Sequence, residues 1–93
     1  MYYVYILKSD IRNWIYVGFT ADLKRRFSEH QQGGVQSTKA YRPFALIFYE
    51  AFSRREDAVR REDYLKSTKG KSTLRMMLRT ALQITDATSM ATD

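Results

Sequence analysis

Several side chains in this sequence are of types that could do chemistry together. Hydroxyl, imidazole and carboxylate groups can exchange protons with a substrate. A guanidinium group can hold a phosphate through paired hydrogen bonds. The candidates are Tyr5, Tyr16, Arg26, His30, which is the chain's single histidine, and Glu62. Whether they act together depends on the elements that carry them.

Strands are predicted to carry both tyrosines. Residues 2–7 and 14–19 are rich in β-branched and aromatic residues and lie on either side of a polar turn at 9–13, which predicts a hairpin. Residues 44–52 form a third such run. It follows Pro43, which can begin a strand but could not interrupt one.

A helix that ends near residue 31 is predicted to carry Arg26 and His30. Thr20 is its expected cap, and Asp22 falls in the first turn, where the helix dipole favours a negative charge. Arg26 and His30 are four residues apart, so their side chains lie on one face of this helix.

Glu62 lies on a second predicted helix, which runs to about Lys66. In helical projection Glu62 falls between Ala58 and Val59, in the middle of the apolar arc. Because an unpaired buried charge is costly, its carboxylate needs a cation, a hydrogen-bond network or a raised pKa. A structural salt bridge to Arg26 would also satisfy it.

A third helix is predicted after Gly70, which we expect to separate it from the second. Leu74 and Leu78 recur there at helical spacing, and Met76 and Met77 are expected to fill the core. The predicted fold is α/β (α+β): a small three-stranded antiparallel or mixed sheet flanked by three helices, in the order β-β-α-β-α-α.

Composition indicates a small basic protein. Sixteen Lys and Arg against ten Asp and Glu leave a net charge of +6 on 93 residues, a balance that favours polyanions. We expect one domain over residues 1–84 and a frayed tail over 85–93. The absence of cysteine excludes disulfides, and the apolar runs are too short to span a membrane. We therefore expect a cytoplasmic protein without membrane contacts, with nucleic acid as its leading partner.

Each candidate residue also has an ordinary structural interpretation. Tyr5 and Tyr16 could be strand aromatics with surface hydroxyls, and Gly18 could mark a bulge. Arg26 could be a solvated helix residue and His30 a packed, hydrogen-bonded one. Read singly, these residues leave both interpretations open.

Taken in order, however, the residues resemble the GIY-YIG nuclease family. The resemblance covers roughly residues 1–80 and looks like the small stand-alone branch of that family, which is related to the amino-terminal nuclease domain of the excision-repair protein UvrC. It rests on Tyr-Val-Tyr at 3–5, Tyr-Val-Gly at 16–18, Arg26, His30, Glu62 and Lys66. The ordered set is more specific than any single motif.

The resemblance implies hydrolysis of a nucleic-acid phosphodiester bond with one divalent cation, magnesium or manganese. It implies that Glu62 holds the metal, that Tyr16 takes a proton from the attacking water, and that Arg26 grips the phosphate. Tyr5 and His30 would orient water, phosphate or leaving group.

Scaffold and substrate contacts are implied in the same way. Tyr3 and Gly18 correspond to structural positions of the motif, although Tyr3 stands where the family name has glycine, and Phe19 stands where some repair members carry lysine. The run of residues 66–71 is either a phosphate-facing loop or a solvated connection. The predicted nucleic-acid contacts are Lys39, Lys66, Lys69 and Lys71.

Two functions remain open on the sequence. One is a metal-dependent endonuclease, a phosphodiester hydrolase acting in DNA repair or processing, with DNA expected ahead of RNA. The alternative is a nucleic-acid-binding module with the same fold and little or no catalysis. We expect such a domain to bind weakly by itself, unless it forms a homodimer or joins a partner protein.

Overall fold

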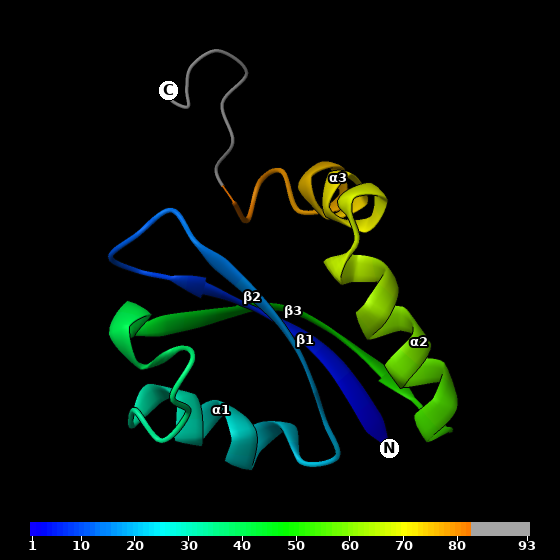
Figure 1. Cartoon of the computed structure of the whole chain (residues 1–93), viewed down its shortest axis with the longest axis horizontal. Helices are drawn as coiled ribbons and strands as arrows, with labels where there is room; N and C mark the ends of the chain where they lie inside the picture. The colour runs from blue at the N-terminus through cyan, green and yellow to red at the C-terminus, as the bar shows by residue number, and fades with distance from the viewer. Residues whose placement is uncertain (83–93) are drawn as a thin grey trace. The chain divides into compact units, whose positions relative to one another are not determined.

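The fold is described by a computed structural model of the chain, which describes residues 1–82; the predicted tail at 85–93 lies outside them. Figure 1 shows the elements in the predicted order, with a short 3-10 helix before the third strand. This confirms the α+β class. The elements are β1 (Tyr2–Ser9), β2 (Ile15–Thr20), α1 (Leu23–Gln31), η1 (Lys39–Tyr41), β3 (Phe44–Phe52), α2 (Arg55–Lys66) and α3 (Thr68–Met77).

The chain divides into two compact units, one of residues Met1–Glu62 and one that begins at Asp63. The boundary falls within α2, so the first unit holds the sheet, α1 and most of the second helix. Within residues 1–82, the structure contains no helix that is both long and apolar enough to cross a membrane.

The sheet of the first unit has three strands in the order β2-β1-β3, and both pairings are antiparallel. The sequence had left a mixed sheet open. In this register Tyr5, on the central strand, lies opposite Gly18 on one side and Tyr49 on the other. Directly opposed residues point to the same face of a sheet, so all three share one face.

Helix α1 covers the face of the sheet to which Tyr5 points. Tyr5, Leu7 and Phe44 form a buried cluster there, and Leu23 and Phe27 of α1 pack against it. Because these two helix residues are four apart, a single stripe of α1 is enough to make the contact.

The beginning of α2 belongs to the opposite face of the sheet. Val4 is fully buried and lies opposite both Phe19 and Glu50, so these residues share that second face. The Arg55 guanidinium lies over the Phe19 ring, and Arg61 forms an ion pair with Glu50. These contacts therefore place α1 and the first part of α2 on different faces of the sheet.

The first helix begins differently from the prediction. Asp22, not Thr20, is the N-cap of α1, because its carboxylate accepts a hydrogen bond from the backbone N–H of Arg25 at 3.1 Å. The Thr20 hydroxyl instead accepts a bond from the N–H of Asp22. Gly33 follows the helix with a positive φ of 82°, which glycine adopts without strain.

Two expectations about the second unit were wrong. Gly70 does not separate two helices but lies buried inside α3, where a side chain would meet the backbone carbonyl of Tyr64. Met76 and Met77 are not core residues, because they are 73% and 44% exposed. The predicted apolar positions Leu74 and Leu78 are buried.

Candidate active site

Tyr5 occupies the centre of the candidate site because of its place on the middle strand. Its side chain is only 1% exposed. A Cβ added to Gly18 would overlap the outer atoms of the Tyr5 ring, so the ring lies across the backbone of Gly18. Glycine is therefore required there by the close approach of an aromatic ring, and the expectation that Gly18 is structural has a specific cause.

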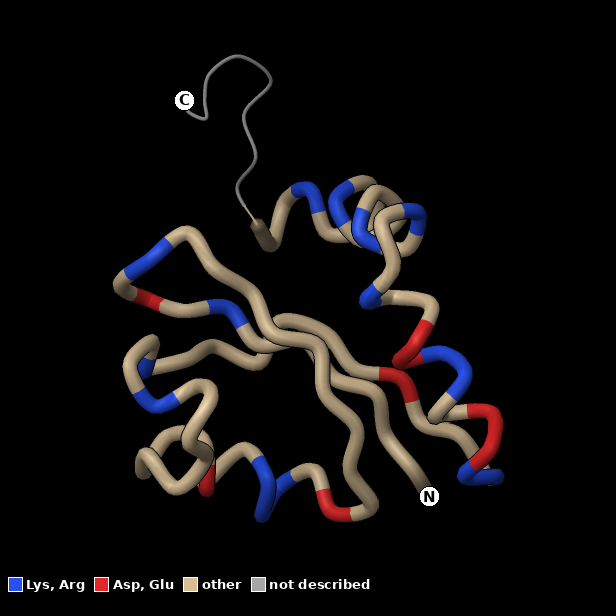
Figure 2. The backbone as a smooth tube through the Cα atoms, viewed as in Figure 1, with Lys and Arg blue, Asp and Glu red and all other residues tan. Residues whose placement is uncertain are grey.

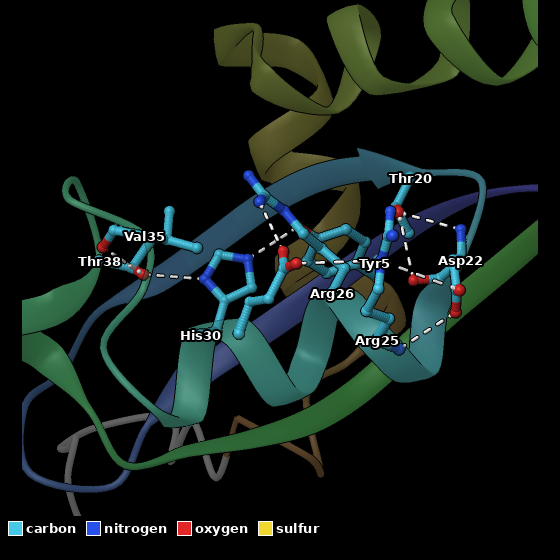
Figure 3. A network of polar contacts seen from close by, with 9 residues as sticks. Tyr5, Thr20, Asp22, Arg25, Arg26, His30, Val35 and Thr38 are labelled. Atoms are coloured by element: carbon cyan, nitrogen blue, oxygen red, sulfur yellow. Dashed lines mark hydrogen bonds and ion pairs between the residues drawn. The ribbon is translucent and has the colours of Figure 1, made fainter.

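His30 extends the site from α1. Its Nε2 atom lies 2.8 Å from the Tyr5 hydroxyl, and its Nδ1 atom lies 2.8 Å from the hydroxyl of Thr38. Figure 3 shows His30 between these two residues. The Thr38 hydroxyl in turn donates to the carbonyl of Val35. His30 and Thr38 are both fully buried. Every polar atom of the imidazole thus has a partner inside the protein.

Arg26 lies one turn before His30 and its side chain is partly exposed. Its Nη1 atom donates to Glu29 Oε1 at 3.0 Å, and its guanidinium also shares a side-chain hydrogen bond with Tyr5. Because arginine can only donate, the Tyr5 oxygen accepts from Arg26. The Thr38 hydroxyl donates to a backbone carbonyl and so accepts from the Nδ1–H of His30, which leaves Nε2 of the neutral imidazole to accept from the Tyr5 hydroxyl.

The electrostatic environment favours the neutral forms of Tyr5 and His30. Burial raises the pKa of Tyr5 to about 12, although the hydrogen bond from Arg26 acts in the opposite direction. Burial also lowers the pKa of His30 below its ordinary value, and the positive charge of Arg26 lowers it further. Both side chains are therefore neutral near pH 7, which agrees with the hydrogen-bond directions inferred above.

Tyr16 and Glu62 complete the group of predicted residues. The Tyr16 ring lies 6.3 Å from that of Tyr5 and 5.2 Å from that of His30, between centroids, and it is half-buried. The charge of Glu62, which is also half-buried, raises the pKa of Tyr5. The structure thus brings Tyr16, Arg26 and His30 into contact with Tyr5, whereas Glu62 is linked to this group by the effect of its charge on the Tyr5 hydroxyl.

The remaining predicted residues lie outside this group. Tyr3 is half-buried on β1, with its ring edge-to-face on Tyr49 at 6.1 Å. Lys39 is exposed in η1 of the first unit. Figure 2 shows basic residues along both α2 and α3, and the exposed lysines of that region include Lys66, Lys69 and Lys71.

Sequence reasoning missed two contacts that position the predicted residues or the elements that carry them. Thr38 fixes the imidazole of His30 from eight residues away, in a loop whose composition carries no spacing signal. Arg61, which was not singled out, makes two hydrogen bonds to the Glu50 carboxylate, at 2.8 and 3.2 Å. This pair joins β3 to the helix that carries Glu62. The available signal in the sequence was Glu50, a charged residue within the otherwise apolar and aromatic run of the third strand.

Comparisons with known proteins agree in assigning a family. A family model described as the GIY-YIG catalytic domain matches residues 1–75. A UPF0213 protein of Staphylococcus haemolyticus is 36% identical over 77 residues, which cover 82% of this chain and 93% of that protein. A UPF0213 protein of Pediococcus pentosaceus is 31% identical over 86 residues, covering 91% and 90% of the two chains.

A solved structure gives the same assignment. The solution NMR structure of a UPF0213 protein of Bacillus halodurans is similar to this chain with a TM-score of 0.53 and 33% sequence identity. The match covers 96% of this chain and 98% of that one. The similarity therefore extends over nearly all of the chain and not over the motifs alone.

Proposed function

The chain belongs to the GIY-YIG catalytic domain family, and from this premise we propose that it is a metal-dependent endonuclease that hydrolyses phosphodiester bonds of nucleic acid. The single observation that supports the proposal is the contact of Tyr16, Arg26 and His30 with Tyr5, whose hydroxyl is also influenced by the charge of Glu62. DNA is the expected substrate ahead of RNA, in repair or processing.

The two tyrosines have different proposed roles because their surroundings differ. Tyr5 is buried and its pKa is raised to about 12, so it keeps its proton at neutral pH and is a poor candidate for a base. We assign it to positioning Arg26 and His30. Tyr16 is half-buried and therefore more accessible, and it is the proposed acceptor of the proton of the attacking water.

Arg26 is the proposed phosphate contact. Its side chain is 37% exposed, and the Tyr5 oxygen holds its guanidinium from the protein side. The ion pair with Glu29 is itself partly exposed, so an incoming phosphate can compete for the same guanidinium. In this role the positive charge opposes the negative charge that grows on the phosphate in the transition state.

The available donors fit one type of divalent cation. Among residues 1–82 there is no group of three or more His, Asp and Glu side chains that could form a closed metal site. Magnesium and manganese do not need one, because they keep water ligands and bind substrate phosphates beside one or two carboxylates. Glu62 is the proposed protein ligand. When bound, such an ion lowers the pKa of a coordinated water and neutralises phosphate charge.

The test is nicking of supercoiled and branched DNA with magnesium or manganese. We expect Tyr16→Phe to lower the cleavage rate by about 100- to 10,000-fold, the usual contribution of a general base. Glu62→Ala should lower it by about 100-fold or more. Tyr2→Phe and Asp63→Ala are matched controls, because they remove the same groups on neighbouring stretches of chain and should cleave at the wild-type rate.

The outcomes separate the two functions. Cleavage that survives both substitutions would come from a contaminant and would exclude the proposed mechanism. Salt-sensitive binding without any cleavage by the wild type would instead support the alternative, a binding module that keeps the fold and the basic surface.

A further inference from the structure

Tyr49 is an exposed aromatic side chain next to the candidate site. It lies directly opposite Tyr5 in the sheet and points to the same face, yet it is 52% exposed whereas Tyr5 is 1% exposed. Helix α1 therefore does not cover this part of the face. The Tyr5 ring lies over Gly18, on the β2 side, so it leaves the β3 side of the face to Tyr49.

Tyr3 holds the Tyr49 ring in a defined orientation. Their centroids are 6.1 Å apart and their planes make an angle of 64°, an edge-to-face contact. In this edge-to-face contact the rings of Tyr3 and Tyr49 are not stacked in parallel. Tyr49 thus presents an exposed aromatic ring with an edge-to-face partner, and its backbone lies about one strand spacing, roughly 5 Å, from that of Tyr5.

We propose that Tyr49, supported by Tyr3, is a stacking site for one unpaired nucleobase of the strand whose phosphate is held at Arg26. This inference rests on the proposed function for the identity of the polymer. Proteins hold single-stranded nucleic acid by combining aromatic rings on which bases stack with cations that contact phosphates. Tyr49 lies opposite Tyr5 in the sheet, and the Tyr5 oxygen accepts from Arg26, so one face of the sheet offers both kinds of group. The net charge of +6 complements such a strand.

The size of the surface favours a base over a protein partner. An aromatic side chain buries about 150–250 Å² when it is covered, whereas a stable protein interface buries about 800 Å² on each partner. Two tyrosine rings are therefore too small for a protein interface by themselves and are comparable with a base. Bases inside a duplex are already stacked, so the site selects an unpaired or frayed position next to the bond to be cut.

The test measures binding and stacking without divalent metal, so that no cleavage occurs. The probe is a single-stranded oligonucleotide with a central 2-aminopurine, whose fluorescence falls on stacking, and the comparison is a duplex of the same sequence. Tyr49→Ala should weaken single-strand binding by about 5- to 100-fold and abolish the quenching, with little change for the duplex. Tyr49→Phe keeps the ring and should behave as the wild type. Ile11→Ala, an exposed apolar residue in the hairpin turn, is the control.

Three results would overturn the stacking site. The first is single-strand binding by Tyr49→Ala that equals wild type, or no binding by the wild type at all. The second is an equal loss for single strand and duplex. The third is a wild-type dimer that Tyr49→Ala dissociates in sedimentation, which would identify a contact with a second copy of the chain.

This test is separate from the nicking assay. Tyr49-dependent quenching without nicking would leave the stacking site standing and contradict hydrolysis. Nicking by the wild type, together with single-strand binding that Tyr49→Ala leaves unchanged, would support hydrolysis and contradict the stacking site.

Discussion

Tyr5 is the residue through which the parts of the candidate site are connected. Its oxygen accepts from Arg26 on one side and its proton points to His30 on the other, which in turn donates to Thr38. A phenylalanine in its place would fill nearly the same space but would make no hydrogen bond to Arg26 or His30. Tyr5 therefore belongs to the buried framework that positions the more accessible groups. The ionisation of its hydroxyl and the packing of its ring give two tests of that framework.

The first test is the pH dependence of stability. Burial raises the pKa of Tyr5 from 10.0 to about 12, so the unfolded chain loses this proton at a lower pH than the folded chain. The stabilisation is fully present below pH 10 and is lost as pH rises through 12, with a slope of up to about 1.4 kcal/mol per pH unit in between. Urea unfolding across this range should show the slope in the wild type. Tyr5→Phe should lack it, and equal slopes for the two proteins would contradict the assignment.

The second test concerns the space that Gly18 leaves for the Tyr5 ring. Because the ring is buried and cannot move aside, Gly18→Ala should lower the free energy of unfolding by about 1–3 kcal/mol. Gly34→Ala is the control, since a Cβ there would be 3.4 Å from the carbonyl oxygen of Glu29, an ordinary contact. In a Tyr5→Ala background the cost of Gly18→Ala should largely vanish. A cost that is unchanged in that background would place the clash elsewhere.

At the scale of elements, local signals predicted most of the secondary structure. The β-branched and aromatic runs gave the strands to within two residues, and β3 coincides with its predicted range. These signals act between near neighbours in the chain, which is why they can be read directly. The network around His30 cannot be read in this way, because Tyr5 is 25 residues away and Thr38 belongs to a loop.

Gly70 shows how helix propensity, a local rule, fails where packing between two helices determines which residue fits. Glycine is a poor helix former, so the sequence suggested a break. In the second unit, however, Gly70 lies where α3 passes against the carbonyl of Tyr64 at the end of α2, and only a residue without a side chain fits. Close packing thus outweighs helix propensity at this position.

A substitution at this glycine should therefore have the reverse of its usual effect. In an exposed helix, Gly→Ala stabilises by about 1 kcal/mol. Here we expect Gly70→Ala to destabilise by about 1–3 kcal/mol, because the new methyl group overlaps a backbone carbonyl that cannot rotate away. Thermal unfolding followed by circular dichroism measures the change. Ser72→Ala, on the exposed side of α3, should change the free energy of unfolding by less than about 0.5 kcal/mol. A gain in stability at Gly70 would contradict the packing argument.

At the scale of the whole molecule, charge is divided between the two units. The candidate site belongs to the first unit, whereas three of the four predicted nucleic-acid lysines, Lys66, Lys69 and Lys71, belong to the second. If the second unit contributes to binding, its contribution is electrostatic and independent of sequence, because lysines contact phosphates and carry no base readout there. Salt dependence measures such contacts directly.

We expect the triple variant Lys66→Gln, Lys69→Gln and Lys71→Gln to flatten the dependence of duplex affinity on salt. Each phosphate contact releases bound counterions, so the slope of log affinity against log salt should become smaller in magnitude by about 2–3 when three contacts are lost. Fluorescence anisotropy at several salt concentrations, again without divalent metal, gives this slope.

A second triple variant, Lys8→Gln, Arg12→Gln and Lys24→Gln, removes the same three charges from the first unit and distinguishes location from net charge. If the lysines of the second unit contact phosphates, only the first triple variant loses the full 2–3 in slope. Equal changes in both variants would mean that the total charge of +6 attracts nucleic acid without a fixed path. In that case the second unit has no special role, and recognition depends on the first unit, where Arg26 and Tyr49 lie.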